Sequence, residues 1–134
     1  MLTEDQISQF RTQGFLVLPD VIPPDTIAAV KREYSALLDR LFAGWAAEGR
    51  VTDAPGLTFW DKLSLSYKAG CDWFQPMDIS LPGGEITAGT PMHFGPAIFD
   101  LVIEKRLLDI IESLIGPEIT LNPIQHVRIK PPAP

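Results

Sequence analysis

The residues of this chain best suited to chemistry are two histidines and an arginine. His93 lies between proline and glycine residues, and His126 and Arg128 alternate in the last apolar stretch of the sequence. An imidazole transfers protons or binds metals near neutral pH, and a guanidinium binds carboxylates through two parallel hydrogen bonds. Neither histidine has an acidic residue two positions after it. Two isolated histidines give weak support for any metal site.

The other reactive residues indicate structure more than catalysis. The single Cys71 excludes an internal disulfide and a cysteine-based zinc site. It has no adjacent basic residue, which is typical of a small buried side chain and not of a nucleophile. Asp61 and Asp72 each adjoin a tryptophan, but no spacing brings them together on one element as an acid–base pair. The glycines form no phosphate-binding pattern.

The composition indicates one globular domain over residues 1–134. Hydrophobic residues make up 46% of the chain, which excludes a disordered protein. The net charge of -6 argues against a nucleic-acid partner, which would require a basic surface. No apolar run is long enough to cross a bilayer, and no leader-like segment follows Met1. We therefore expect no membrane contact and a cytoplasmic protein.

Four segments carry helical signals. The capping-box sequence TEDQ opens a short helix over residues 3–13, and a glycine follows it. A long helix with one apolar stripe is expected from Pro24 to about Gly49. Some turns of helix are expected within Thr58–Lys68. A further helical pattern covers Pro96–Ile115, with a break near Glu104.

Two segments carry strand signals. Phe15–Leu18 is a continuous apolar run and is expected to form a buried strand. Ile119–Ile129 alternates loosely with a period of two, which places His126 and Arg128 on one face and Gln125 on the other.

Residues 50–95 are the least periodic region and are expected to be largely loop. This region contains Trp73, His93 and several other aromatic residues. A long loop rich in aromatic residues covers either the surface of the core or a bound substrate, and the first is the simpler interpretation.

Four segments, taken in order, resemble the N-terminal half of the phytanoyl-CoA dioxygenase family. They are LTEDQISQFRTQGFLVLPD at residues 2–20, the long helix after Pro23, LLDIIESLIGP at residues 107–117, and the closing strand with VRIKPP. The resemblance implies an α+β fold, with N-terminal helices plus the first strands of a double-stranded β-helix (jelly roll), incomplete in this chain. It also implies Fe(II) and 2-oxoglutarate as cofactors of the complete enzyme, which hydroxylates a small organic substrate.

The chain departs from the family at the metal site. In the family, the strand that ends in Lys-Pro-Pro comes shortly before a His-x-Asp motif. Here Phe94 and Gly95 follow His93, Val127 and Arg128 follow His126, and the sequence ends at Pro134. We therefore predict no catalytic residue and no metal ligand in this chain, and no cofactor bound by this chain alone.

The resemblance suggests binding residues even so. It places the closing strand beside the metal site, so His126 and Arg128, followed by Gln125, are candidates for the pocket that binds 2-oxoglutarate. A solvated strand face is the alternative for these three. His93 and Trp73 are candidates for contacting the substrate at the mouth of the site. The alternatives are a loop histidine bonded to backbone and an aromatic ring that covers the core.

Two functions remain open from the sequence. The first is a 2-oxoglutarate-dependent oxygenase whose metal-binding half lies outside this chain. The second is a non-catalytic module that acts by self-association or by pairing with a partner chain through an exposed C-terminal strand, because an unpaired strand recruits other strands. The second predicts a dimer or a hetero-complex.

Overall fold

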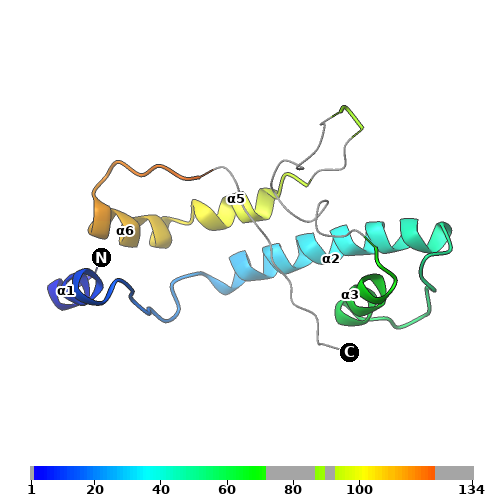
Figure 1. The fold of residues 1–134 in the computed structure, drawn as a ribbon. Helices are drawn as coiled ribbons and strands as arrows, with labels where there is room; N and C mark the ends of the chain where they lie inside the picture. The colour runs from blue at the N-terminus through cyan, green and yellow to red at the C-terminus, as the bar shows by residue number, and fades with distance from the viewer. Residues whose placement is uncertain (1, 72–86, 90–92, 123–134) are drawn as a thin grey trace. The chain divides into compact units, whose positions relative to one another are not determined.

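The computed structural model describes residues 2–71, 87–89 and 93–122. These residues form helices α1 (Glu4–Gln13), α2 (Pro24–Ala47), α3 (Phe59–Lys68), α5 (Pro96–Val102) and α6 (Lys105–Ile115), shown in Figure 1. The chain divides into two compact units. Unit 1 comprises residues 1–30 and 96–121, and unit 2 comprises residues 31–95 and 122–134. The single domain expected over residues 1–134 stays a prediction.

The predicted α+β fold is wrong for the residues that the structure describes, because all their regular elements are helices and none is a strand. Residues 15–18, expected to form a buried strand, have no regular structure, and Phe15 and Val17 are 58% and 79% exposed. A strand needs a neighbour to satisfy its backbone groups, and no described segment provides one. Residues 119–122 are also irregular. The rest of the expected closing strand lies outside the described residues.

The helix predictions are confirmed. In α1, the Thr3 hydroxyl accepts a hydrogen bond from the Gln6 backbone N–H at 3.2 Å, and the Gln6 side chain accepts one from the Thr3 N–H at 2.9 Å. Gly14 ends this helix with a φ of 77°, and its N–H donates to the Phe10 carbonyl at 2.8 Å. Such left-handed backbone favours glycine. The predicted break near Glu104 separates α5 from α6.

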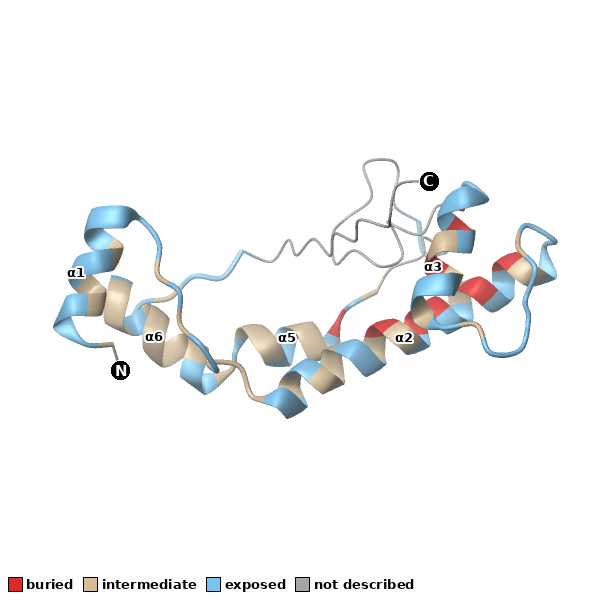
Figure 2. Ribbon diagram, turned by 90° about the horizontal axis from the view of Figure 1, so that it is seen from below, coloured by how far each residue is buried: buried red, intermediate tan, exposed pale blue. Residues whose placement is uncertain are grey.

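Unit 1 contains α1, α5, α6 and the first turns of α2. No residue of α1, α5 or α6 is buried. Figure 2 shows these three helices in the colours of half-buried and exposed residues. A side-chain contact within the unit joins Thr26 to Glu104, where the hydroxyl donates to the carboxylate at 3.5 Å. Unit 1 therefore lacks a buried core among its described residues.

Unit 2 is built on the remainder of α2. The apolar stripe predicted for this helix is confirmed, since its buried members recur at steps of three and four. They are Tyr34, Leu37, Leu38, Phe42 and Trp45. Leu38 is fully buried, and Phe42 is 1% exposed. Each such side chain stabilises the fold by about 1.5–3 kcal/mol relative to an exposed one.

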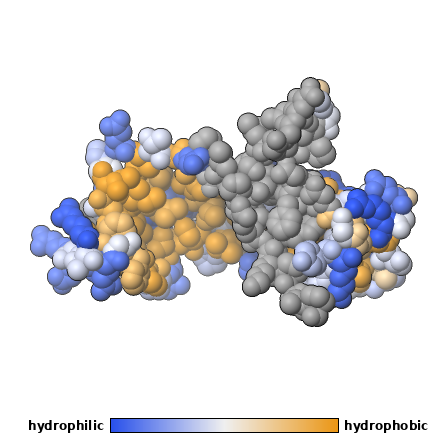
Figure 3. Space-filling model, viewed as in Figure 1, coloured by the Kyte–Doolittle hydropathy of each residue, from blue (hydrophilic) through white to orange (hydrophobic). Residues whose placement is uncertain are grey.

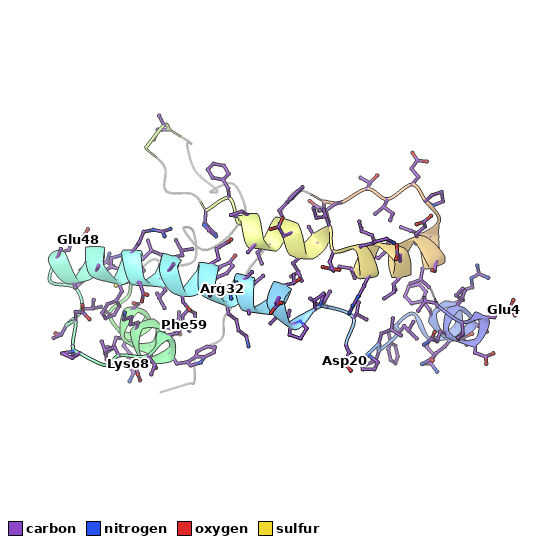
Figure 4. All side chains as sticks on the ribbon, turned by 180° about the vertical axis from the view of Figure 1, so that it is seen from behind. Glu4, Asp20, Arg32, Glu48, Phe59 and Lys68 are labelled. Carbon is purple, nitrogen blue, oxygen red and sulfur yellow. The ribbon has the colours of Figure 1, made fainter. Side chains whose placement is uncertain are left out.

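Helix α3 packs on this stripe and begins with a second capping box. The Thr58 hydroxyl accepts from the Asp61 N–H at 3.2 Å, and the Asp61 carboxylate accepts from the Thr58 N–H at 2.9 Å. Leu63 and Ser66 of α3 are fully buried. The Ser66 hydroxyl donates to the Lys62 carbonyl at 2.8 Å, so this buried polar group is satisfied. Figure 4 labels Phe59 and Lys68 at the two ends of α3.

Lys62 connects α3 with α2. Its ammonium lies 2.7 Å from Asp39 Oδ1 of α2 and 5.7 Å from the centre of the Phe42 ring. The hydrogen bond from Lys62 to Asp39 raises the pKa of the lysine. These contacts fix α3 against α2 in addition to the buried apolar surface.

None of the helices in the described ranges is both long and apolar enough to cross a membrane.

Candidate functional site

Of the five residues predicted to bind cofactor or substrate, the structure describes one, His93. Trp73, Gln125, His126 and Arg128 lie outside the described residues. The roles suggested for those four residues therefore stay predictions. His93 lies in unit 2, in the segment that leads to α5.

His93 pairs with a carboxylate of α2. Its Nε2 lies 2.6 Å from Glu33 Oε1, a distance typical of a strong, charge-assisted hydrogen bond. The two side chains are 11% and 14% exposed, so the pair lies largely out of water. The expected backbone partner of a loop histidine is thus replaced by an acidic side chain 60 residues away in the sequence.

The aromatic ring of Tyr34 completes this cluster. It meets the His93 imidazole edge-to-face, with ring centroids 5.5 Å apart and planes at 76°. Tyr34 is 6% exposed and belongs to the apolar stripe of α2. Because neighbouring helix positions are about 100° apart, Glu33 lies beside the stripe while Tyr34 lies on it. The cluster of Glu33, Tyr34 and His93 therefore stands at the edge of the core.

The chemical capacity of this cluster is to orient an imidazole. A carboxylate on one ring nitrogen fixes the tautomer and the ring plane, and Nδ1 is then the ring nitrogen suited to contact a polar ligand. The cluster supplies one imidazole and one carboxylate. Within the described ranges no three histidine, cysteine, aspartate or glutamate side chains gather where they could hold a metal ion. The described residues therefore do not fit the two-histidine, one-carboxylate set that binds non-haem iron.

No signal in the sequence marks Glu33 as a functional residue. Its position outside the apolar stripe indicates a solvated polar face, and no spacing rule links it to a histidine 60 positions later. Tyr34 belongs to the apolar stripe expected for the long helix, and that pattern gives no sign of a histidine contact. Only the tertiary structure brings these three residues together.

One interpretation of a reactive residue is confirmed. Cys71 is 5% exposed with a free thiol, as expected for a small buried residue. Asp61 completes the capping box of α3. Asp72 lies outside the described residues, so the interpretation that these two aspartates form no acid–base pair stays a prediction. Hydrogen bonds from the Thr58 side chain and backbone lower the pKa of the Asp61 carboxyl.

A shallow hollow of unit 2 also brings cations together but is not an anion site. It has a volume of about 320 Å³ and is lined by Gly49, Arg50, Val51, Thr52, Leu65, Lys68 and Ala69. The Arg50 guanidinium is already engaged, since it donates to the Gly70 carbonyl at 3.1 Å and lies 3.9 Å from Glu48. The hollow also lies at the C-terminal ends of α2 and α3, where the helix dipoles disfavour anions.

Comparison of the chain with protein-family models, with curated proteins and with solved structures found no significant match to any of them.

Proposed function

We propose that this chain supplies a helical part of an oxygenase similar to phytanoyl-CoA dioxygenase, which uses Fe(II) and 2-oxoglutarate to hydroxylate a small organic substrate. The observation that carries the proposal is the order of four segments in the sequence: the capped helix with QGFLVLPD, the long helix, LIGP and VRIKPP. The proposal does not include the strands of a double-stranded β-helix, because the described residues are helical.

The metal ligands of this oxygenase would come from outside these 134 residues. The described part of the chain offers no group of three ligands, and neither His93 nor His126 has an acidic residue two positions later. Fe(II) and 2-oxoglutarate supply the oxidising chemistry when both are bound in the complete enzyme. This chain's own contribution would be to position the substrate and to exclude water, with His93 oriented by Glu33 at 2.6 Å as a polar contact. A reducing, cytoplasmic location belongs to the same proposal.

The test compares the 134-residue chain with the natural polypeptide or complex that contains it. Anaerobic titration of the isolated chain with Fe(II) and 2-oxoglutarate is expected to give no metal-to-ligand charge-transfer band. The natural polypeptide is expected to give this band and to convert 2-oxoglutarate to succinate in air. If the natural polypeptide binds neither Fe(II) nor 2-oxoglutarate, the oxygenase proposal is wrong.

The second candidate function is a non-catalytic module that acts by association with another chain. The observation that favours it is the apolar surface that unit 1 exposes, which includes Phe99 at 58% and Ile115 at 63%. The C-terminal strand proposed as the pairing element lies outside the described residues. Sedimentation of the chain with and without candidate partners tests this function, and a chain that sediments as a monomer in both conditions would exclude it.

A further inference from the structure

Unit 1 carries the whole net charge of the protein. It contains nine acidic and three basic residues, whereas unit 2 contains eight of each, so their net charges are -6 and zero. The acidic residues of unit 1 are Glu4, Asp5, Asp20, Asp25, Asp100, Glu104, Asp109, Glu112 and Glu118. The two units also differ in packing, because α1, α5 and α6 of the acidic unit contain no buried residue.

Unit 1 also exposes an apolar face, formed by residues of α5, α6 and the segment that follows each of them. Figure 3 shows apolar side chains gathered where Figure 1 draws these elements. The large hydrophobic residues exposed there are Phe99, Ile103, Ile115 and Leu121. Helix α6 is apolar along one side only, and its apolar residues are Leu107, Leu108, Ile110, Ile111, Leu114 and Ile115. A helix of this pattern normally buries that side.

We infer that this apolar face of unit 1 binds a basic amphipathic segment of another protein. The apolar side of such a segment would cover Phe99 and Ile115, and its lysine or arginine residues would meet the surrounding carboxylates. A second copy of this chain fits less well, because it would bring another -6 charge to the same contact. An anionic membrane surface is disfavoured by the same repulsion.

Two carboxylates of unit 1 are suited to meet the basic residues of the partner. Glu112 follows Leu108 by one helical turn, so it lies beside the apolar side of α6, and Glu118 lies just beyond the helix. Neither has an ion pair within the described part of the chain. Asp109, by contrast, is already paired with Lys105 at 2.7 Å. The inference does not depend on the oxygenase proposal.

The test measures binding of the whole chain to two fluorescent synthetic peptides by anisotropy. One peptide is an amphipathic helix of leucine and lysine, and the other has glutamate in place of lysine. The lysine peptide is expected to bind at least about tenfold more tightly, with an affinity that falls as salt screens the charges. Phe99→Asn should weaken binding about tenfold, because it removes a large apolar contact. Glu112→Lys and Glu118→Lys should each weaken it about threefold.

Matched variants in unit 2 serve as controls. Phe94→Asn changes a phenylalanine that is 78% exposed, and Glu48→Lys reverses an exposed charge, so both should leave peptide binding unchanged. Equal binding of the two peptides would overturn the inference. Dimerisation of the chain would also overturn the inference if Phe99→Asn abolished it, because a second copy would then occupy the apolar face. Failure of both peptides to bind would overturn it as well, because the chain would then cover its own apolar face.

Discussion

Both units contain a helix with an apolar side, but only in unit 2 are residues of that side buried. In unit 2, the apolar stripe of α2 meets α3 and buries Leu38, Phe42 and Leu63 almost completely. In unit 1, helix α6 also has its apolar residues along one side, yet none of its residues is buried. The pattern of hydrophobic residues is therefore not sufficient to make a core, because a core also needs a second element that covers the stripe.

The largest expected effect is a loss of stability on truncating a phenylalanine of unit 2. Phe42→Ala should lower the free energy of unfolding by about 3–5 kcal/mol, because Phe42 is 1% exposed and its removal leaves a cavity. Phe99→Ala in unit 1 should change it by no more than about 0.5 kcal/mol, because Phe99 is 58% exposed. Urea denaturation followed by circular dichroism measures both values. Equal losses would show that unit 1 has a core of its own.

The next effect concerns the cluster of Glu33, Tyr34 and His93. Glu33→Ala should lower the free energy of unfolding by about 1–3 kcal/mol, because it leaves the largely buried His93 without its acceptor. Glu48→Ala is the matched control. Its carboxylate is 63% exposed and 3.9 Å from Arg50, so the loss should be within about 0.5 kcal/mol. If both variants unfold at the same urea concentration, the cluster does not stabilise unit 2.

The two capping boxes allow a direct comparison of α1 with α3. Thr58→Ala should cost about 1 kcal/mol of global stability, because α3 carries the buried Leu63 and Ser66. Thr3→Ala removes the same kind of cap from α1, which has no buried residue. It should therefore fray α1 locally and leave the main unfolding transition unchanged. A matching shift of that transition in Thr3→Ala would mean that α1 unfolds together with unit 2.

The smallest expected effect is a difference in pH dependence between these caps. The pKa of Asp61 in the folded protein lies below its ordinary value of 3.8, because Thr58 donates to the carboxylate. The cap therefore stabilises α3 above pH 3.8 and loses this contribution as the pH falls through the lowered pKa. Asp61→Asn should remove that part of the acid dependence of unfolding. The corresponding residue of α1 is the uncharged Gln6, so the local fraying of α1 in Gln6→Ala should be the same at pH 3 and pH 7.

Local signals in the sequence predicted the helices well. The capping box of α1, the step of three and four along α2, and the break near Glu104 all depend on residues close together in the chain. Such interactions form within one or two turns, so a sequence pattern captures them.

The irregular, exposed structure of residues 15–18 and the partner of His93 were not predictable in this way. A short apolar run such as Phe15–Leu18 has no periodicity that separates a strand from an exposed linker, and its fate depends on whether another segment pairs with it. The contact between His93 and Glu33 spans 60 residues and appears only when the segment before α5 folds back on α2. Tertiary packing decides both features.

The main difference between the units is that the described core lies in unit 2, whereas unit 1 keeps an apolar face for a partner. Hydrogen–deuterium exchange of the isolated chain, read by mass spectrometry on peptides from α2, α3 and α6, tests it most directly. This difference predicts slow exchange in residues 37–45 and 63–66, and fast exchange throughout α6. Protection of α6 equal to that of α2 in the absence of any partner would contradict it.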